Sequence, residues 1–362
     1  MLYKNKAEKV IPMISLAVLG FAHGHVHSLL QQWAAHPEYE VKAVAGWDRN
    51  EETQRENCEK YNLQPRSAED ILEDREIEAV LICAETAFHC DLAVRAAEAK
   101  KKIILYKPMA VKLRDAEKIV KSVEENGVDF TVAFQMRCDP ANLAIKEKID
   151  SGEMGKCFHF RRRHGLSSHL WGNFENSWHV NPELNRDIFA DDAAHPVDLI
   201  LWLFGMPRYV NCEISTARRN YIRNDTAVAV FRYDSGLLCE VSFSAVCSAA
   251  EITTEAYFED GAMQHYGGDQ PAAAAYDGTM PALRWYKNED KKWTNADLAV
   301  PDSQAERIAG QAMPLAEFLN GKRPPICTAK EAYDALRVVL ACCQSSVRGG
   351  RVSPEDPSLF II

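Results

Sequence analysis

The chain of 362 residues lacks the features that mark membrane, secreted and nucleic-acid-binding proteins. No apolar run approaches the roughly 18 residues that span a bilayer, and the polar start, MLYKNKAEKVIP, has no apolar signal core. The net charge of -10 argues against a general nucleic-acid binder. The 11 cysteines include no C-x-x-C pair, which is typical of reduced thiols. We therefore expect a cytoplasmic protein with neither a membrane nor a nucleic-acid partner.

A metal-binding pattern is also missing. His179, Asp191, Asp192 and His195 are of types that bind metals, but their spacing matches no zinc motif. We therefore predict no metal site.

Glycine is scarce where a dinucleotide-binding loop would need it. The apolar run ISLAVLG ends at Gly20, and an amphipathic helical pattern follows. The usual loop at such a junction is G-x-G-x-x-G, but Ala22 and His25 hold its second and third glycine positions, and Gly24 comes one residue early. The loop alone therefore leaves two interpretations open, a nucleotide site or an ordinary strand–helix turn.

The end of the second strand pattern favours the nucleotide interpretation. Asp48 lies about 20 residues beyond the loop, where an acid commonly binds the adenosine ribose and favours NAD over NADP. Arg49 beside it could instead face a 2′-phosphate. Asp48 could also cap the next helix, a role compatible with either cofactor.

What the first 130 residues do contain is an alternation of strand and helix patterns, which predicts a doubly wound parallel sheet. Right-handed crossovers place the carboxyl ends of the strands at one edge, where ligands bind. The expected strands are 15–20, 39–48, 79–84, 102–106 and 130–134, and the expected helices are 25–35, 51–61, 68–73, 90–99 and 113–126.

After Pro140 the pattern predicts an α+β region with an open, mainly antiparallel sheet. Its expected strands are 157–164, 209–216, 226–233, 237–244 and 251–258, its helices are 141–151, 192–204, 303–319 and 329–346, a hairpin covers 282–293, and a loop covers 267–281.

Four stretches resemble the Gfo/Idh/MocA oxidoreductases in the order in which that family has them. LICAETAFHCDLAVRAAEAKKKIILYKPMA resembles its third and fourth strands, which carry T-P-x-x-x-H-like and E-K-P segments. VAFQMRCDPANLAIKEKIDSGEMG resembles its domain junction, and DIFADDAAHPVDLILWLFG resembles its D-x-x-x-H-x-x-D helix, here Asp191, His195 and Asp198. The ending KEAYDALRVVLACCQSSVRGGRV also matches, so the resemblance covers nearly everything from Ile14 to Val352.

Three positions depart from the family pattern. Tyr106 stands where E-K-P has its glutamate, although Lys107 is retained. Glu85 and Thr86 replace T-P, and NRDIFA replaces the usual glycine-rich run before the Asp–His helix. These departures leave the core chemistry possible and the substrate open.

The resemblance implies a Rossmann domain with a doubly wound parallel sheet at 14–138, after an extension at 1–13. It implies a substrate-binding and oligomerisation domain at 139–362, whose Asp–His helix faces the cofactor. The implied reaction is hydride transfer between NAD, with NADP less favoured, and a secondary hydroxyl of a sugar, cyclitol or related polyol. The implied cofactor-binding residues are Gly20, Ala22, His23, Gly24, His25, Asp48, Arg49, Ala84, Glu85, Thr86, His89, Tyr106, Lys107 and Gln135.

The substrate side is rich in residues that suit a carbohydrate, since indole faces pack on sugar C–H groups and imidazoles bind hydroxyls. Asp191 and His195 lie one helical turn apart. We favour His195 as the general base, Lys107 as the alkoxide stabiliser and Asp191 as the orienting carboxylate. Lys107 itself is the alternative base. The predicted substrate-binding residues are His164, Trp178, His179, Asp191, Asp192 and His195.

Two other functions stay open. One is a glycosidase that oxidises a ring hydroxyl transiently with tightly held NAD, and the other is a non-catalytic nucleotide-sensing regulator. The apolar strands TAVAVFRY and LLCEVSFSAV also predict a homodimer or homotetramer that packs sheet to sheet.

Overall fold

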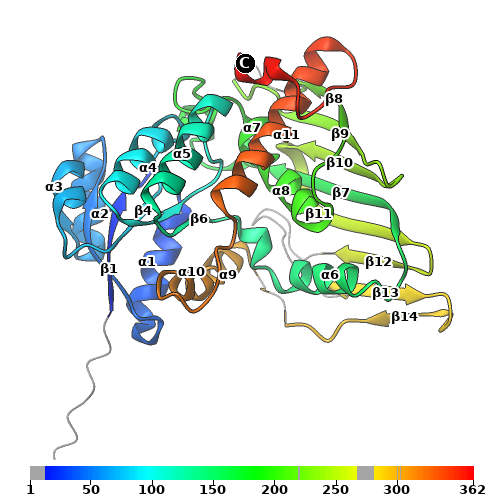
Figure 1. Cartoon of the computed structure of the whole chain (residues 1–362), viewed down its shortest axis with the longest axis horizontal. Coiled ribbons are helices and arrows are strands. Elements are labelled where there is room, and N and C mark those ends of the chain that lie inside the picture. Colours follow the sequence, from blue (N-terminus) through cyan, green and yellow to red (C-terminus); the bar gives the residue numbers. More distant parts are fainter. Residues whose placement is uncertain (1–12, 219–220, 267–280, 300, 302) are drawn as a thin grey trace, which may run out of the picture.

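The structure is a computed structural model that describes residues 13–218, 221–266, 281–299, 301 and 303–362. The expected N-terminal extension, apart from Met13, and the expected loop at 267–280 lie outside the described residues. Within the described part of the chain, no helix is long and apolar enough to cross a bilayer. Two sheets lie at opposite ends of the molecule, with helices between them (Figure 1).

The first sheet has six parallel strands in the order β3-β2-β1-β4-β5-β6. The order reverses between β1 and β4, so the ligand-binding switch point lies there. The strands are β1 (Ile14–Leu19), β2 (Val41–Trp47), β3 (Gln64–Pro65), β4 (Ala79–Ile82), β5 (Lys102–Leu105) and β6 (Phe130–Val132), and the helices are α1 (His25–Ala35), α2 (Glu51–Tyr61), α3 (Ala68–Glu73), α4 (His89–Glu98) and α5 (Leu113–Asn126).

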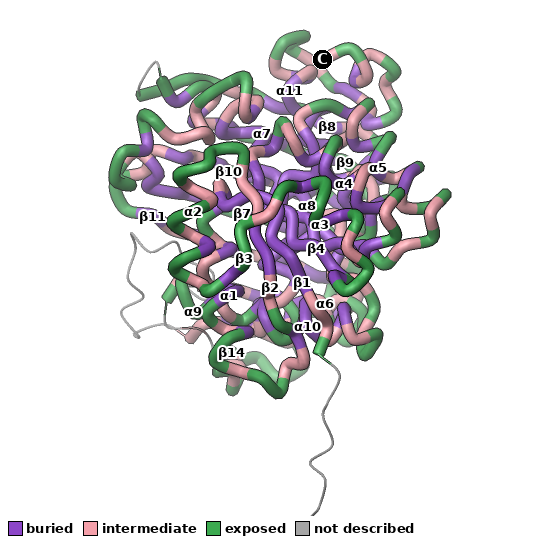
Figure 2. The backbone as a smooth tube through the Cα atoms, turned by 90° about the vertical axis from the view of Figure 1, so that its left-hand side faces the viewer, coloured by how far each residue is buried: buried purple, intermediate pink, exposed green. Residues whose placement is uncertain are grey.

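The predicted alternation in this half is confirmed. All four residues of β4 and the last four of β1 are buried, as expected of central parallel strands (Figure 2). Strand β3 was not predicted, because its two exposed residues carry no apolar pattern.

The second sheet has eight strands in the order β14-β13-β12-β11-β7-β10-β9-β8. Only β7 and β10 pair in parallel among its described ladders, so the mainly antiparallel prediction is confirmed. The strands are β7 (Cys157–Ser167), β8 (Tyr209–Ser215), β9 (Thr226–Arg232), β10 (Leu238–Ser244), β11 (Val246–Phe258), β12 (Gly261–Tyr266), β13 (Leu283–Lys287) and β14 (Lys292–Asn295).

The helices after β6 lie largely between the two sheets (Figure 1). They are α6 (Pro140–Ser151), α7 (Ile188–Asp192), α8 (Ala194–Phe204), α9 (Gln304–Ala309), α10 (Ala312–Leu319) and α11 (Ala329–Arg348), and short 3-10 turns lie at Pro37–Tyr39, Thr86–Phe88, Gln135–Arg137, Ser168–Leu170, Phe174–Asn176, Trp178–Val180 and Pro357–Phe360.

The predicted helix 192–204 is confirmed as α8, and the separate α7 that ends just before it was not predicted. The predicted helix 303–319 is divided into α9 and α10, and Pro314 cannot donate to the carbonyl of Gly310 at this break. Strand β12 was not predicted at all.

Residues near the C-terminus return to the first sheet. Leu315 and Leu319 of α10 share a buried cluster with Leu16 and Trp33, and the Trp33 indole donates to the carbonyl of Ala312 at 2.9 Å. Helix α10 lies after the proposed domain boundary at 138/139, but it packs on the first sheet.

Candidate active site

The loop after β1 has the geometry of a dinucleotide cradle despite its missing glycines. Gly20 has φ +93°, and a Cβ there would lie 2.4 Å from the Cα of Ala84, so only glycine fits. Gly24 faces open space, since a Cβ at that position would meet no described atom within 4 Å. The Asp48 carboxylate accepts the Phe21 amide at 2.7 Å and so fixes the loop against the end of β2.

Unsatisfied polar atoms follow the carboxyl edge of the first sheet. His25 Nδ1 lies after β1, Thr86 Oγ1 after β4 and Gln135 Oε1 after β6, and each is buried without a hydrogen-bond partner among the described residues. Such atoms favour a polar ligand across this edge. Together with the cradle at Gly20, they fit a dinucleotide.

Asp48 and Arg49, at the end of β2 where the adenosine of a dinucleotide is expected, have separate contacts. Asn50 caps α2, accepting from the amides of Glu52 and Thr53, so the capping role does not fall to Asp48. The Arg49 guanidinium lies 3.8 Å from the centre of the Phe88 ring. The second pairing of Arg49, with Glu85 at 3.5 Å, keeps it on the β4 side of the crevice.

Two predicted cofactor residues are instead engaged within the protein. The two ring nitrogens of His89 lie 2.9 Å from the carbonyl of Pro108 and 3.0 Å from that of Ala84, and the one N–H of the neutral ring donates to one of them, so His89 lies between the loops after β4 and β5. The Tyr106 ring is buried against His23, with centroids 4.5 Å apart. Tyr106 thus fills space beneath the β1 loop.

A cavity of about 370 Å³ opens between the segments that follow the strands of the first sheet and a wall formed by α7, α8, β7 and β11. Residues from both halves line it, so members of the two predicted sets lie around one cavity. The lining comprises His23, Gly24, His25, Lys107, Gln135, Met136, His164, Leu166, Trp171, His179, Asp192, His195, Ile252 and Gln304.

Lys107 contributes a buried cation to this cavity. Its ammonium donates to Asp191 Oδ1 at 2.8 Å and Asp192 Oδ1 at 3.0 Å. Burial works to lower the pKa of Lys107, but the two carboxylates outweigh it and raise that pKa above its ordinary value. Asn185 donates to the other oxygen of Asp191 at 3.1 Å. Lys107 is therefore a held, permanently charged group.

The pKa of His195 is lowered, whereas that of Lys107 is raised. His195 is buried, and its Nδ1 has no hydrogen-bond partner in the described part of the chain. Burial is the largest cause that holds the pKa of His195 well below 6.5, and the Lys107 charge and His164 lower it further. The ring is therefore neutral at physiological pH and can accept a proton. The Asp191 carboxylate is engaged by Lys107 and Asn185, so it orients the ammonium instead of this imidazole.

The remaining predicted substrate residues divide into two groups. His164 and His179 line the cavity, and the His164 ring lies 6.3 Å from that of His195. Trp178 does not line it. Its indole donates to the carbonyl of Ala22 at 2.9 Å, and its ring stacks on His179 at 4.0 Å.

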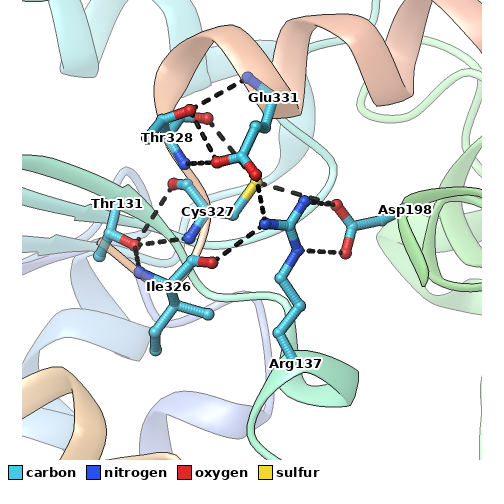
Figure 3. A network of polar contacts seen from close by, with 7 residues as sticks. All are labelled: Thr131, Arg137, Asp198, Ile326, Cys327, Thr328 and Glu331. Atoms are coloured by element: carbon cyan, nitrogen blue, oxygen red, sulfur yellow. Dashed lines mark hydrogen bonds and ion pairs between the residues drawn. The ribbon is translucent and has the colours of Figure 1, made fainter. Parts of the chain in front are cut away.

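A second buried ion-pair centre holds the helix that carries His195. Arg137 binds Asp198, one turn beyond His195, through two bonds of 2.9 and 2.8 Å (Figure 3). Arg137 also donates to Glu331 at 2.7 Å and to the carbonyl of Ile326 at 3.2 Å. Asp198 therefore faces away from the cavity and fixes α8.

Sequence reasoning did not identify Asn185 and Arg137 as contributors to the site. Asn185 lies in the NRDIFA departure, where the missing glycines were the only signal considered. Arg137 follows Gln135 in the junction motif, and nothing local to it reveals its partner 61 positions away. Within the described residues, no group of three or more histidines, cysteines or carboxylates is placed to hold a metal ion.

Comparison with known proteins agrees with this geometry. Residues 14–134 match the oxidoreductase family with an NAD-binding Rossmann fold, and residues 142–264 match the GFO/IDH/MocA C-terminal domain. The chain is 29% identical to scyllo-inositol 2-dehydrogenase (NAD(+)) of Bacillus subtilis over 209 residues, 54% of this chain and 56% of that protein. The chain thus spans little more than half the length of this curated relative.

A longer match and a solved structure extend the comparison. The uncharacterized oxidoreductase YrbE of Bacillus subtilis is 30% identical over 304 residues, 79% of this chain and 81% of that protein. The structure of levoglucosan dehydrogenase with NADH and levoglucosan has the same fold, with a TM-score of 0.79 at 20% identity over 95% of this chain and 100% of that one. The chain belongs to the Gfo/Idh/MocA family of oxidoreductases, and its first sheet is the NAD-binding Rossmann fold of that family.

Proposed function

We propose that the protein is an NAD(H)-dependent dehydrogenase of a secondary hydroxyl on a sugar, cyclitol or related polyol. The observation that carries this proposal is the pairing of a fixed cation, Lys107, with a neutral buried imidazole, His195, in one cavity at the Rossmann edge. The names of the relatives, an inositol dehydrogenase and a levoglucosan dehydrogenase, agree with this substrate class.

The residues divide the work of alcohol oxidation. His195 accepts the hydroxyl proton, because its neutral ring has a free lone pair. The burial that lowers its pKa keeps the ring unprotonated and also makes it a weaker base than a free imidazole. The Lys107 ammonium stabilises the negative charge that develops on the substrate oxygen. Asp191 and Asn185 hold that ammonium in place. Bound NAD⁺ would supply the hydride acceptor. Because its pKa is raised, Lys107 is a poor base, which supports His195 over the alternative assignment.

Asp48 supports NAD as the cofactor, because its carboxylate at the end of β2 would repel a 2′-phosphate. Calorimetric titration with NADH and NADPH tests this. We expect tighter NADH binding, and tighter NADPH binding would mean that Arg49 governs the ribose site. If the protein binds neither NADH nor NADPH, the proposed function is wrong.

The reaction itself is tested by incubating the protein and NAD⁺ with inositols, hexoses and anhydrosugars while NADH absorbance is recorded. Accumulation of NADH supports a dehydrogenase. Glycoside cleavage without net NADH would instead support the redox-neutral glycosidase. Binding without either reaction would support the regulator.

We also propose that the protein is a homo-oligomer through the outer face of the second sheet. Val228 and Val230 of β9 are exposed there at 51% and 38%. Arg161 pairs across strands with Glu240 and Glu255 on the same face, so this face is more polar than the sequence predicted. Light scattering at micromolar concentration tests the proposal, and a stable monomer would contradict it.

A further inference from the structure

The segment 178–185 crosses the carboxyl edge of the first sheet. At one end, the Trp178 indole N–H donates to the carbonyl of Ala22, in the loop after β1, at 2.9 Å. At the other, the amide of Ala87, after β4, donates to the carbonyl of Leu184 at 3.0 Å. Strands β1 and β4 are neighbours at the switch point, where a dinucleotide lies in a doubly wound sheet. The segment therefore lies across the cofactor crevice.

We propose that this segment, which we term the strap, closes over bound NAD(H) and that Trp178 is its latch. The inference rests on the proposed function, since it concerns the same cofactor. Ala22 holds the second glycine position of the loop, where the backbone approaches the pyrophosphate. A cofactor bound at that loop must displace the latch before it can leave.

The strap is also tied to the catalytic centre. Asn185 at its end is buried and bonds both the carbonyl of His179, at 3.2 Å, and Asp191, at 3.1 Å. The Trp178 ring stacks on His179, which lines the cavity. The strap thus connects the loop that holds the cofactor with the carboxylate that holds Lys107. Trp178 is a positioning residue, and this role replaces the sugar contact predicted for it.

The test is the rate at which NADH leaves the protein, measured by stopped-flow fluorescence after displacement with excess NAD⁺. Trp178→Phe keeps an aromatic ring but loses the N–H donor. We expect NADH to leave the variant roughly three- to tenfold faster, the loss that corresponds to one hydrogen bond. The matched control is Trp293→Phe on β14, a partly exposed tryptophan of the second sheet, which should release NADH at the wild-type rate.

Hydrogen exchange of the wild-type protein provides a second measurement that needs no variant. If the strap closes on the cofactor, NADH should slow exchange of the Ala87 amide, which bonds Leu184. Equal NADH release rates for the wild type and Trp178→Phe, or unchanged exchange at the Ala87 amide, would overturn the proposal that the strap closes on the cofactor. Either result would leave the proposed function intact. A wild-type protein that binds no NADH would overturn both.

Discussion

Two buried cations, each bound by two carboxylates, hold the helices around His195, one at the end of α7 and the other on α8. Lys107 binds Asp191 and Asp192, and Arg137 binds Asp198 and Glu331. Each cation has a side chain only 4% exposed and one fully buried carboxylate, but the second carboxylates differ, since the Asp192 side chain is 11% exposed and that of Glu331 is 43% exposed.

The difference lies in access to the candidate active-site cavity. The Lys107 ammonium also lies 3.4 Å from the Asp191 carbonyl, so both cations use their donors within the protein, but of the two only Lys107 lines that cavity. Arg137 places three of its nitrogens on Asp198, Glu331 and the carbonyl of Ile326, and Figure 3 shows these partners surrounding it. Lys107 lines a cavity on one side, so a substrate oxygen can reach its charge. A planar guanidinium suits a fixed bidentate pair, whereas an ammonium is a point charge that can accept a new partner. We therefore infer that the Arg137 centre, which does not line this cavity and which we term the closed centre, stabilises the fold, and we propose that the Lys107 centre, the open centre, takes part in the reaction.

The largest expected effect of this difference is on catalysis. His195→Ala should lower kcat by roughly 10²–10⁴-fold, since it removes general-base assistance. Its NADH dissociation constant should stay nearly unchanged, because His195 belongs to α8 rather than to the β1 loop. Steady-state kinetics with a substrate found in the panel, beside calorimetry, measures both quantities.

Lys107→Ala provides the comparison for that variant. It should also lower kcat, and it should weaken NADH binding somewhat, since Lys107 follows β5 at the nucleotide edge. Wild-type kcat in His195→Ala with no turnover in Lys107→Ala would make the lysine the base. Normal turnover in both would exclude this cavity as the active site.

At the closed centre the expected effect is on stability. Arg137→Met leaves Asp198 buried without its cation, and breaking a buried pair typically costs about 3–5 kcal/mol of unfolding free energy. Urea denaturation measures the loss. The control is Arg208→Met, which removes an exposed Arg–Asp pair of the same 2.8 Å length and should leave the urea midpoint unchanged. Equal midpoints for the two variants would remove the distinction between the centres.

The same comparison explains what the sequence could predict. Lys107 and His195 were identified because each lies in a local motif, and strands such as β4 were identified because burial on both faces leaves a continuous apolar run. Asn185, Arg137 and the latch formed by Trp178 act through partners far away in the chain, which no periodicity encodes. The helix break before Pro314 could have been predicted, since a proline inside a helical pattern removes a backbone donor.

A smaller effect is expected from Asp191→Asn. The amide keeps the shape of the carboxylate but loses its charge, so Lys107 would keep Asp192 as its one charged partner. We expect kcat to fall by about tenfold if Asp191 only orients Lys107, and by as much as in His195→Ala if Asp191 is itself the base. The two values of kcat, measured on the same substrate, distinguish these roles.

The smallest expected effect is on the pH dependence of the free energy of unfolding, to which the two centres should contribute differently. Buried histidines surround the open centre, and burial is the largest cause that lowers the pKa values of His23, His179 and His195 below 6.5 and that of His25 to about 3. None of the seven residues drawn at the closed centre is a histidine. Below pH 6.5 these histidines therefore bind protons in the unfolded chain but stay neutral in the folded protein. Stability is complete above that pH and is lost as pH falls, by up to about 1.4 kcal/mol per pH unit for each histidine.

Urea denaturation between about pH 8 and about pH 5 measures this slope. His195→Gln should reduce the slope of the unfolding free energy against pH by the contribution of one histidine, because glutamine does not titrate in the unfolded state. If His195→Gln has the same slope as the wild type, the imidazole is not held neutral by burial, and the electrostatic argument for His195 as the base loses its foundation. The slope thus tests the protonation state of His195 without any substrate.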